Sequence, residues 1–585
     1  MLRETIYHWP LKTIQGFILA LGLMWAGTAL ALDAQGDITT DTTWGEDVLL
    51  TGVVNVKAPA VLTISPGVTV YGNAKTALII ERGAKIMAIG TPEEPIVFTS
   101  NSISPARTDW GGVAINGYAP INNAGAFSCP GNPPNAVGEA GMGEYGGCDP
   151  HDSSGILRYV RIEYGGYRID GENEWNALTL QGVGDGTIIE YVQCHMNSDD
   201  GIEFFGGTVN ARNILNSGCA DDHFDWTNGY TGKAQFIVAH LADDDGDRGI
   251  EGDNLKADNV AQPVSHPTVY NMTLVGNANI PDVGPDVGGG GEGILLRRGS
   301  AITLKNSIVT GFQNAAVDLD NEATFVGINT GDLVIDSCIF YDNLGGQNFN
   351  ADEQDDIKQG YTPTVTTGDF ITSIMSYNRV VDPGLASTSF QSPDLRPDMF
   401  SPVFAGAAAV PADGFFVENA DFIGAFDSEY DWTKGWTSFG GNLPRIPVPT
   451  GFHEYWYYPQ NYPYTSANPE LSRPISFGCM DRGELDVRVG LHSFASPMDI
   501  YCGLMLPDGI IYTIGENMQI RGLSDMQPWK RSQTHSVYEN IASGSGFSWP
   551  HGLYAGFVLA VPAGTNIATM GMDACGYFWG FLLTL

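Results

Sequence analysis

The chain has 585 residues, of which 43% are hydrophobic, and this composition excludes a chain that is disordered throughout. Its 28 lysines and arginines face 67 aspartates and glutamates, and the net charge of -39 argues against nucleic acid or an anionic membrane surface as a partner. The length suits two or three domains, and the charge favours cations, a salty medium or simply a solvated acidic surface.

Residues 1–31 have the features of a secretory signal peptide. Arg3 and Lys12 supply positive charge, the apolar run "GFILALGLMWAG" is too short to span a bilayer, and Ala29-Leu30-Ala31 forms a cleavage site. We therefore expect an exported protein, located extracellularly or at the cell surface, with the periplasm as an alternative. No transmembrane segment is expected in the mature chain.

Export makes disulfides possible, and the chain has eight cysteines. Cys129 and Cys148 flank the Gly/Pro-rich stretch "CPGNPPNAVGEAGMGEYGGC", and we predict that they form a disulfide that closes this loop. Cys194 and Cys219 are candidates for a second pair, whereas Cys338 lies in an apolar run and is predicted to be a buried thiol. The pairing of the remaining cysteines stays open: Cys479, Cys502 and Cys575.

Short runs rich in Val, Ile and Thr alternate with Gly, Asn and Asp after the signal, as in "AVLTISPGVTVYG" and "ALIIERGAKIMAIG". Such runs predict β-strands separated by tight turns. No long stretch has a persuasive helical period.

The middle of the chain contains an internal repeat. "GTIIEYVQCHMNSDDGIEFFGG" aligns with "GTVNARNILNSGCADDHFDWTNG" at a shift of 22 residues, which matches Val192 with Ile214, and the next unit places Ile237 at a shift of 23. A unit of about 22 residues with three short strands is the smallest coil of a right-handed parallel β-helix, whose coils stack about 4.8 Å apart. An antiparallel sandwich would not explain matching residues at a constant shift.

The blocks "GIEFFGGTVN", "DDHFDWTNGYTGKAQF", "DRGIEGDN", "GILLRRG" and "DWTKGWTSFG" resemble the pectin-lyase-like β-helix superfamily, and more closely a group of uncharacterised exported bacterial β-helix proteins. The resemblance covers roughly residues 45–440. It implies the fold and little about activity. We therefore assign residues 32–442 to the β-helix.

Residues 443–453 follow as a Pro-rich linker. Beyond it, runs such as "ELDVRVGL" and "GLYAGFVLAVPAG" read as antiparallel strands. We assign residues 454–585 to a small β-sandwich accessory domain. The fold class is therefore all-β, a parallel β-helix followed by a sandwich.

The repeat predicts stacked carboxylates. Asp200 should lie over Asp222 and Glu203 over Asp225, and like charges about 4.8 Å apart repel by roughly 3.5 kcal/mol at an effective dielectric constant near 20. Either a proton or a bridging cation must compensate, and oxygen ligands in a turn suit calcium. The predicted calcium ligands are Asp200, Glu203, Asp222, Asp225, Asp245, Asp247 and Glu251.

Two alternatives remain open for these carboxylates. Asp, Asn and Gly also form β-helix turns by capping their own backbone amides, and Arg248 could neutralise part of the stack. The third hypothesis is catalysis, because polysaccharide hydrolases of the superfamily resembled here use clusters of aspartates and cleavage of a glycosidic bond needs two carboxylates. Its candidate residues are Asp200, Asp222, His223 as a base, and Asp225.

Aromatic residues recur beside the same turns. Phe205, Trp226 and Tyr230 could form a strip that binds a sugar chain, and the alternative is a stacked aromatic core. The sequence therefore predicts an exported binding or structural β-helix protein, glycan-associated and calcium-stabilised. A polysaccharide lyase or hydrolase acting through Asp200–Asp225 is the alternative. An enzyme should present an open groove, whereas a scaffold should have that face covered by the loops 123–150 and 277–292.

Overall fold

The computed structural model describes residues 31–585 except 124–134, 139–140, 169–173, 278–290, 350–359, 429, 440–452 and short stretches beyond 457. The described chain divides into compact units, one of which is Leu32–Gly441 and another of which contains the segment that begins at Asn442. No helix among the described residues is long and apolar enough to cross a membrane.

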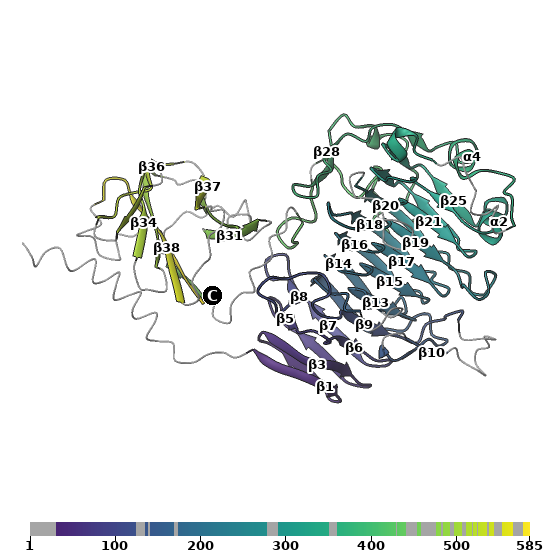
Figure 1. Ribbon diagram of the computed structural model, residues 1–585, viewed down its shortest axis with the longest axis horizontal. Coiled ribbons are helices and arrows are strands. Elements are labelled where there is room, and N and C mark those ends of the chain that lie inside the picture. Colours follow the sequence, from purple (N-terminus) through teal and green to yellow (C-terminus); the bar gives the residue numbers. More distant parts are fainter. Residues whose placement is uncertain are drawn as a thin grey trace, which may run out of the picture. The chain divides into compact units, whose positions relative to one another are not determined.

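The unit Leu32–Gly441 is a parallel β-helix, as predicted, whose strands stack like the rungs of a ladder (Figure 1). Most coils contribute one strand to each of three faces. Face 1 contains the end of β3 (Val48–Val56), β6 (Leu78–Ile80), β9 (Val113–Asn116), β13 (Leu178–Gln181), β15 (Ile202–Phe205), β17 (Phe224–Thr227), β19 (Ile250–Asp253), β21 (Ile294–Arg297) and β24 (Asp318–Leu319).

Faces 2 and 3 are joined by long strands that bend once and contribute to both. These are β12 (Gly155–Glu163), β14 (Ile188–His195), β16 (Asn210–Ser217), β18 (Lys233–His240) and β20 (Thr268–Val275). The other strands of face 2 are β2 (Thr42–Trp44), β4 (Val61–Ile64), β7 (Lys85–Ile89), β22 (Ile302–Lys305) and β25 (Leu333–Asp336). Those of face 3 are β5 (Thr69–Gly72), β8 (Ile96–Ser100), β23 (Ile308–Thr310), β26 (Ile339–Tyr341) and β27 (Arg379–Val380), while β1 (Leu32–Ile38) pairs with β3.

The bend between faces 2 and 3 has a left-handed backbone conformation in coil after coil. Asparagine adopts this conformation more readily than most residues, and it occupies three of these bends. The bend residues, all with φ between 51° and 57°, are Tyr159, Tyr191, Asn213, Phe236, Asn271, Asn306 and Ser337.

The interior confirms the predicted repeat. Val192, Ile214 and Ile237 are Cα partners in neighbouring parallel strands, and all three are fully buried in the central core. The shift of 22 to 23 residues therefore corresponds to one coil.

The β-helix also contains one short helix that periodicity did not indicate. α2 (Glu322–Thr330) is a nine-residue α-helix with only three buried residues, and a stretch this short carries a weak periodic signal. Shorter helical turns are η2 (Leu344–Gly346), α4 (Thr367–Asp369), η3 (Phe370–Ile374) and η4 (Pro402–Phe404).

The last part of this unit folds back over the coils. Residues 385–439, which we call the clasp, include β28 (Leu385–Ser387), β29 (Asp394–Pro397) and η4, and their side chains pack against the outer side of face 3. Near face 1, the small pair β10 (Ala136–Val137) and β11 (Glu144–Tyr145) belongs to the loop 123–150. Within this loop, the Met142 carbonyl accepts a hydrogen bond from Asn116.

The cysteines are in part as predicted. Cys338 is buried and free, as expected. Cys194 and Cys219 are also free, so this candidate pair forms no disulfide: Cys194 is in register with Asn216, which places Cys219 three residues further on, in the turn. Cys148 is disulfide-bonded. Its predicted partner Cys129 lies outside the described residues, so the Cys129–Cys148 pair stays a prediction.

The C-terminal unit contains antiparallel sheets, in agreement with the predicted sandwich. Cys502 is buried and free in β33 (Met498–Met505), whereas the side chains of Cys479 and Cys575 lie outside the described residues. The linker residues 443–452 also lie outside them. One sheet contains β30 (His453–Tyr457), β39 (Tyr577–Thr584), β38 (Leu553–Pro562), β33 (Met498–Met505), β34 (Ile511–Ile514), β35 (Ile520–Gly522) and β36 (Lys530–Gln533), and another contains β31 (Ile475–Met480), β32 (Glu484–Leu491) and β37 (Val537–Ala542).

Candidate functional site

A row of carboxylates crosses three neighbouring coils on the outer side of face 1. Glu203 in β15, Asp225 in β17 and Glu251 in β19 are Cα partners in register, which confirms the predicted stack. Each residue is only 8% exposed, so the row is a largely covered structure and not an open charged surface.

A second row lies in the turns that precede these strands. Asp200 and Asp222 occupy equivalent positions, and the Asp222 amide donates a hydrogen bond of 2.9 Å to Oδ1 of Asp200. Asp200 therefore caps a backbone amide of the next coil, whereas the turn-capping alternative expected an amide of its own turn.

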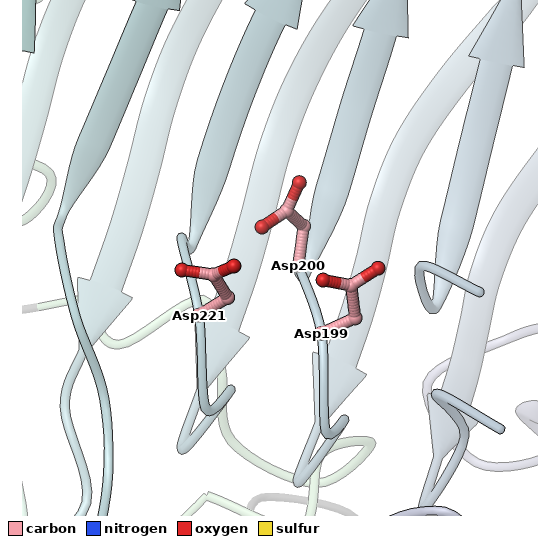
Figure 2. A group of neighbouring side chains, drawn as sticks. All are labelled: Asp199, Asp200 and Asp221. Atoms are coloured by element: carbon pink, nitrogen blue, oxygen red, sulfur yellow. The ribbon is translucent and has the colours of Figure 1, made fainter. Parts of the chain in front are cut away.

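The carboxylates gather in three groups whose oxygens lie within 4.8 Å of one another. Figure 2 shows one of them: Asp199 and Asp200 project from the turn of one coil, and Asp221 projects from the equivalent turn of the next. The other two groups are Asp200–Glu203–Asp225 and Asp221–Asp222–Asp247.

Asp199 and Asp221 were not among the predicted ligands. The signal for them was the doublet itself, because the sequence repeats Asp-Asp at the same 22-residue shift. Asp247 was predicted and joins a group. Asp245 was predicted and joins none of the three: its Oδ1 accepts the amide of Gly246 at 3.1 Å, so the metal assignment is not supported at this position.

Arg248 lies among the carboxylates and neutralises part of their charge, as the sequence suggested. Its Nη1 is 3.1 Å from Glu251 and 3.6 Å from Asp222, and its Nε is 3.3 Å from Glu292. Burial works against the charged guanidinium, yet Asp222, Glu251 and the other acids raise the pKa of Arg248 above its ordinary value. It therefore remains a cation at every physiological pH.

Two further arginines close the end of the row. Arg297 forms ion pairs with Glu251 and, at 2.9 Å, with Asp253, and Arg298 also pairs with Asp253. Asp253 and Arg297 are themselves register partners in β19 and β21. Neutralisation by arginine is thus concentrated at the Glu251 end of the row.

The Glu203 end carries excess negative charge. Burial raises the pKa of Asp200, Asp222 and Asp225 well above the ordinary range, and charges on neighbouring carboxylates raise each further. Asp225 also shares a side-chain hydrogen bond with Glu203, which requires a proton on one of the two carboxyl groups. Without a cation, this end of the row is therefore partly protonated.

The donor set fits a hard cation. Oδ1 of Asp222 and Oδ1 of Asp225 are buried and accept no hydrogen bond within the described part of the chain. All ligand atoms in the three groups are carboxylate oxygens, which suit calcium. Asp200, Glu203 and Asp225 are the residues that would hold it most deeply.

His223 is not placed to act as a base. Its ring is fully buried, Nδ1 lies 3.0 Å from the Arg248 carbonyl oxygen, and Nε2 lies 3.1 Å from that of His240. Burial lowers the pKa of His223 to about 4. Both nitrogens thus face the backbone, which contradicts the catalytic role considered from the sequence.

Two of the three predicted ligand-binding aromatics belong to the core. Trp226 and Tyr230 are fully buried, Tyr230 stacks on Phe204 at 4.2 Å, and the Trp226 indole donates to Ser300 at 2.9 Å. Neither side chain can contact an external sugar in this conformation, so the stacked-core alternative describes them. Phe205 is partly exposed, and its role in ligand binding stays a prediction.

The chain belongs to the pectate-lyase-like β-helix domain family, whose match covers residues 36–376. This match ends before the clasp and before the C-terminal unit. The comparison with curated proteins found no match.

A comparison with solved structures returned the tailspike protein of Acinetobacter phage vB_ApiP_P1. The identity is 10%, the alignment covers 100% of this chain and 85% of the tailspike, and the TM-score is 0.20. A likeness this low carries no argument about fold or ligand.

Proposed function

We propose that the protein is an exported binding or structural β-helix protein that associates with a glycan at the cell surface or in the medium. We further propose that calcium stabilises the carboxylate row on face 1. The signal-like residues 1–31 support export. Membership of a pectate-lyase-like family supports a carbohydrate as the class of partner.

The observation that carries this proposal is the chemistry of face 1. Glu203, Asp225 and Glu251 lie in register on its outer side. Phe205 lies in the same strand as Glu203, two residues further along β15. Carboxylates, guanidinium groups and an aromatic edge are groups that can contact sugar hydroxyls and ring faces. Face 3, by contrast, is covered by the clasp.

Binding is favoured over catalysis because the polar groups are committed to one another. His223 faces two backbone carbonyls, and Glu251 is paired with arginines on both sides. The described part of the loop 123–150 lies on face 1, where Met142 contacts Asn116 and Gln181. This agrees with the covered face expected of a scaffold; most of the loop 277–292 lies outside the described residues.

The alternative, a polysaccharide lyase or hydrolase, has one specific observation in its favour. Arg248 and Arg297 lie directly beside carboxylates that fit calcium, and calcium with a basic residue is the combination expected of a lyase. Under this alternative, calcium would increase the acidity of the sugar and the charged arginines would stabilise the carbanion. Neighbouring acids raise the pKa of Arg248 and Arg297, so the proton would pass to water and not to either arginine.

A glycan array separates these possibilities. The purified full-length protein would be screened with calcium and with a chelator, and each hit would then be assayed for new reducing ends and for unsaturated products. Binding without product supports the proposed function, and an unsaturated product replaces it by the lyase. Absence of both binding and product across the array would refute glycan association.

Phe205→Ala provides a site-directed control for the same experiment. We expect it to weaken binding to the best glycan because it removes the partly exposed ring beside the carboxylate row. Ile188→Ala, a half-buried apolar residue on face 2, is the matched control and should bind normally. Equal binding by both variants would place the glycan elsewhere.

A further inference from the structure

The clasp follows the part of the chain that matches the family. That match ends at residue 376, whereas the clasp spans residues 385–439. It passes along face 3 and the bends beside it, over strands β14, β16, β18 and β20, and reaches the ring of Tyr159 in β12. It is therefore an addition that crosses several coils at once.

Side chains of successive coils hold the backbone of the clasp. Gln193 Oε1 accepts the Ser438 amide at 2.9 Å, and Gln235 Oε1 accepts the Val417 amide at 2.7 Å. Further contacts of the same kind pair Arg212 with the Phe415 carbonyl, Asn271 with the Phe422 carbonyl, Thr273 with the Ala425 amide, and Asn306 with both backbone groups of Ala408.

A second apolar core lies between face 3 and the clasp. Leu215, Val238 and Val275 project outward from face 3 and are buried against clasp residues that include Trp432 and Trp436. Rings of the bend residues join the same contact. Trp436 meets Tyr159 and Tyr191 edge-on at 5.6 and 6.2 Å, and Phe422 stacks on Phe236 at 6.2 Å.

These contacts join residues that are far apart in the sequence. Ser438 is 245 residues from Gln193, and Val417 is 182 residues from Gln235. Contacts of such high sequence separation become favourable only after the intervening chain is ordered. The coils, in contrast, pair with neighbours about 22 residues away.

We infer that the clasp is a separate cooperative segment that docks after the coils have stacked and that limits the rate at which the β-helix unfolds. Interactions that form after the folding transition state slow unfolding and leave the folding rate unchanged. For an exported protein, a slow unfolding rate is protection against proteolysis. The clasp thus gives the β-helix kinetic stability.

The test uses the full-length protein with Gln193→Ala and Gln235→Ala combined. Both glutamines bind clasp amides, and neither is a bend residue. Each also donates one hydrogen bond to the next coil, Gln193 to Ser217 and Gln235 to Asn271, so exchange at coil amides is measured beside exchange at clasp amides. The matched control is Gln181→Ala, a fully buried glutamine on the outer side of face 1 that contacts Met142 and not the clasp.

The double variant loses four hydrogen bonds to Ser438 and Val417 of the clasp. This loss should raise the unfolding rate in denaturant about tenfold or more, with a refolding rate within about twofold of wild type. Hydrogen exchange should accelerate at the Gly424 and Ala425 amides, which neither glutamine contacts, and stay slow at Ile214. Gln181→Ala should leave exchange at Gly424 and Ala425 unchanged.

Three results would overturn the inference. One is an unchanged unfolding rate in the double variant. Another is a refolding rate that falls by the same factor as the stability, which would place the clasp in the folding nucleus. The third is equal exchange rates for clasp and coil amides in the wild-type protein, which would mean that the clasp never opens independently.

Discussion

Asp225 lies between two other carboxylates and is buried, an arrangement that costs free energy whenever all three groups are ionised. The protein can meet this cost through a proton, a guanidinium or a metal cation. Guanidinium groups neutralise the Glu251 end of the row, and a shared hydrogen bond joins Asp225 to Glu203. Stability should therefore depend on both calcium and pH.

The calcium dependence is tested by thermal melting. A ligand present at 100 times its dissociation constant stabilises the folded state by about 2.7 kcal/mol, so chelation should lower the melting temperature and millimolar calcium should restore it. Magnesium should restore less because it demands tighter octahedral geometry. Sodium chloride at equal ionic strength controls for screening of the net charge.

The variant Asp222→Asn with Asp225→Asn should lose most of the calcium response. It removes the negative charge of two carboxylates whose Oδ1 atoms accept no hydrogen bond in the described structure. This loss of charge also relieves repulsion, so the metal-free form should melt at or above the wild-type temperature. A wild-type melt that is the same in chelator and in calcium would reduce the row to turn capping and charge neutralisation.

The pH dependence is tested by comparing metal-free wild type with Asp225→Asn. The folded-state pKa of Asp225 is raised above its unfolded value of about 3.9, so the folded protein binds the proton more tightly. The contribution of protonated Asp225 to the free energy of unfolding is fully present below pH 4 and is lost as pH rises through the folded pKa.

As pH rises from about 4, wild type should therefore lose free energy of unfolding relative to Asp225→Asn, which has no carboxyl group at this position. The difference should grow by up to about 1.4 kcal/mol for each pH unit until the folded pKa is reached. Buried His223 and His240 contribute an opposite slope below pH 6.5, and this slope cancels in the comparison. A difference between the two proteins that is independent of pH would contradict the shifted pKa.

At the level of the coil, the sequence predicted the register of the strands but not the clasp that covers face 3. The 22-residue shift identified the stacking of Val192, Ile214 and Ile237, because equivalent residues of a β-helix must share one environment. It could not place Leu215, whose outward side chain is buried only because a segment 170 or more residues later returns to it. Burial by a segment so distant in the sequence produces no periodic pattern in the residues around Leu215.

The same limit explains the errors at the site. The carboxylate row was predictable because register alone stacks Glu203 on Asp225. The burial of Trp226 and Tyr230 was not, because "DHFDWTNGY" does not reveal which side of a turn faces the core. The Asp199–Asp221 contact could have been predicted, because the sequence repeats the pair Asp-Asp at a shift of 22 residues and both aspartates of each pair should then stack.

Ile214→Asp tests the stack itself. The substitution buries an unpaired charge in the central core and should abolish soluble folded protein or cost at least about 3 kcal/mol of unfolding free energy. Ile188→Asp in the same type of long strand is half-buried and should cost about 1 kcal/mol or less. Equal effects in denaturant unfolding would argue against an inward Ile214.

The loop between Cys129 and Cys148 has its own prediction. Closing it with a disulfide should stabilise the protein by roughly 3 kcal/mol in the loop-entropy model. Peptide mapping without reductant should recover the two cysteines in one linked fragment. Recovery of Cys148 linked to any other cysteine would reject this pairing.

The whole molecule consists of compact units with different architectures: a parallel β-helix in Leu32–Gly441, and antiparallel sheets in the segment that begins at Asn442. Such units usually have their own cooperative unfolding transitions. The carboxylate row belongs entirely to the β-helix, so any effect of calcium should be confined to one of them.

Scanning calorimetry of the full-length protein should therefore resolve two transitions. Chelation should shift the transition of the β-helix and leave that of the C-terminal unit in place. Assignment follows from Ile214→Asp, which should remove only the former. A single transition that shifts as a whole would show that the two units unfold together.

The clasp has a consequence for how this chain can change in length over evolution. Solenoids commonly gain or lose repeats, because each coil contacts only its neighbours. Here Gln193, Gln235 and Asn306 hold particular backbone positions of one continuous segment, so an inserted coil would displace every later contact by about 4.8 Å. The clasp thus acts as a ruler that fixes the number of coils beneath it, and duplications should be tolerated only outside the span that it measures.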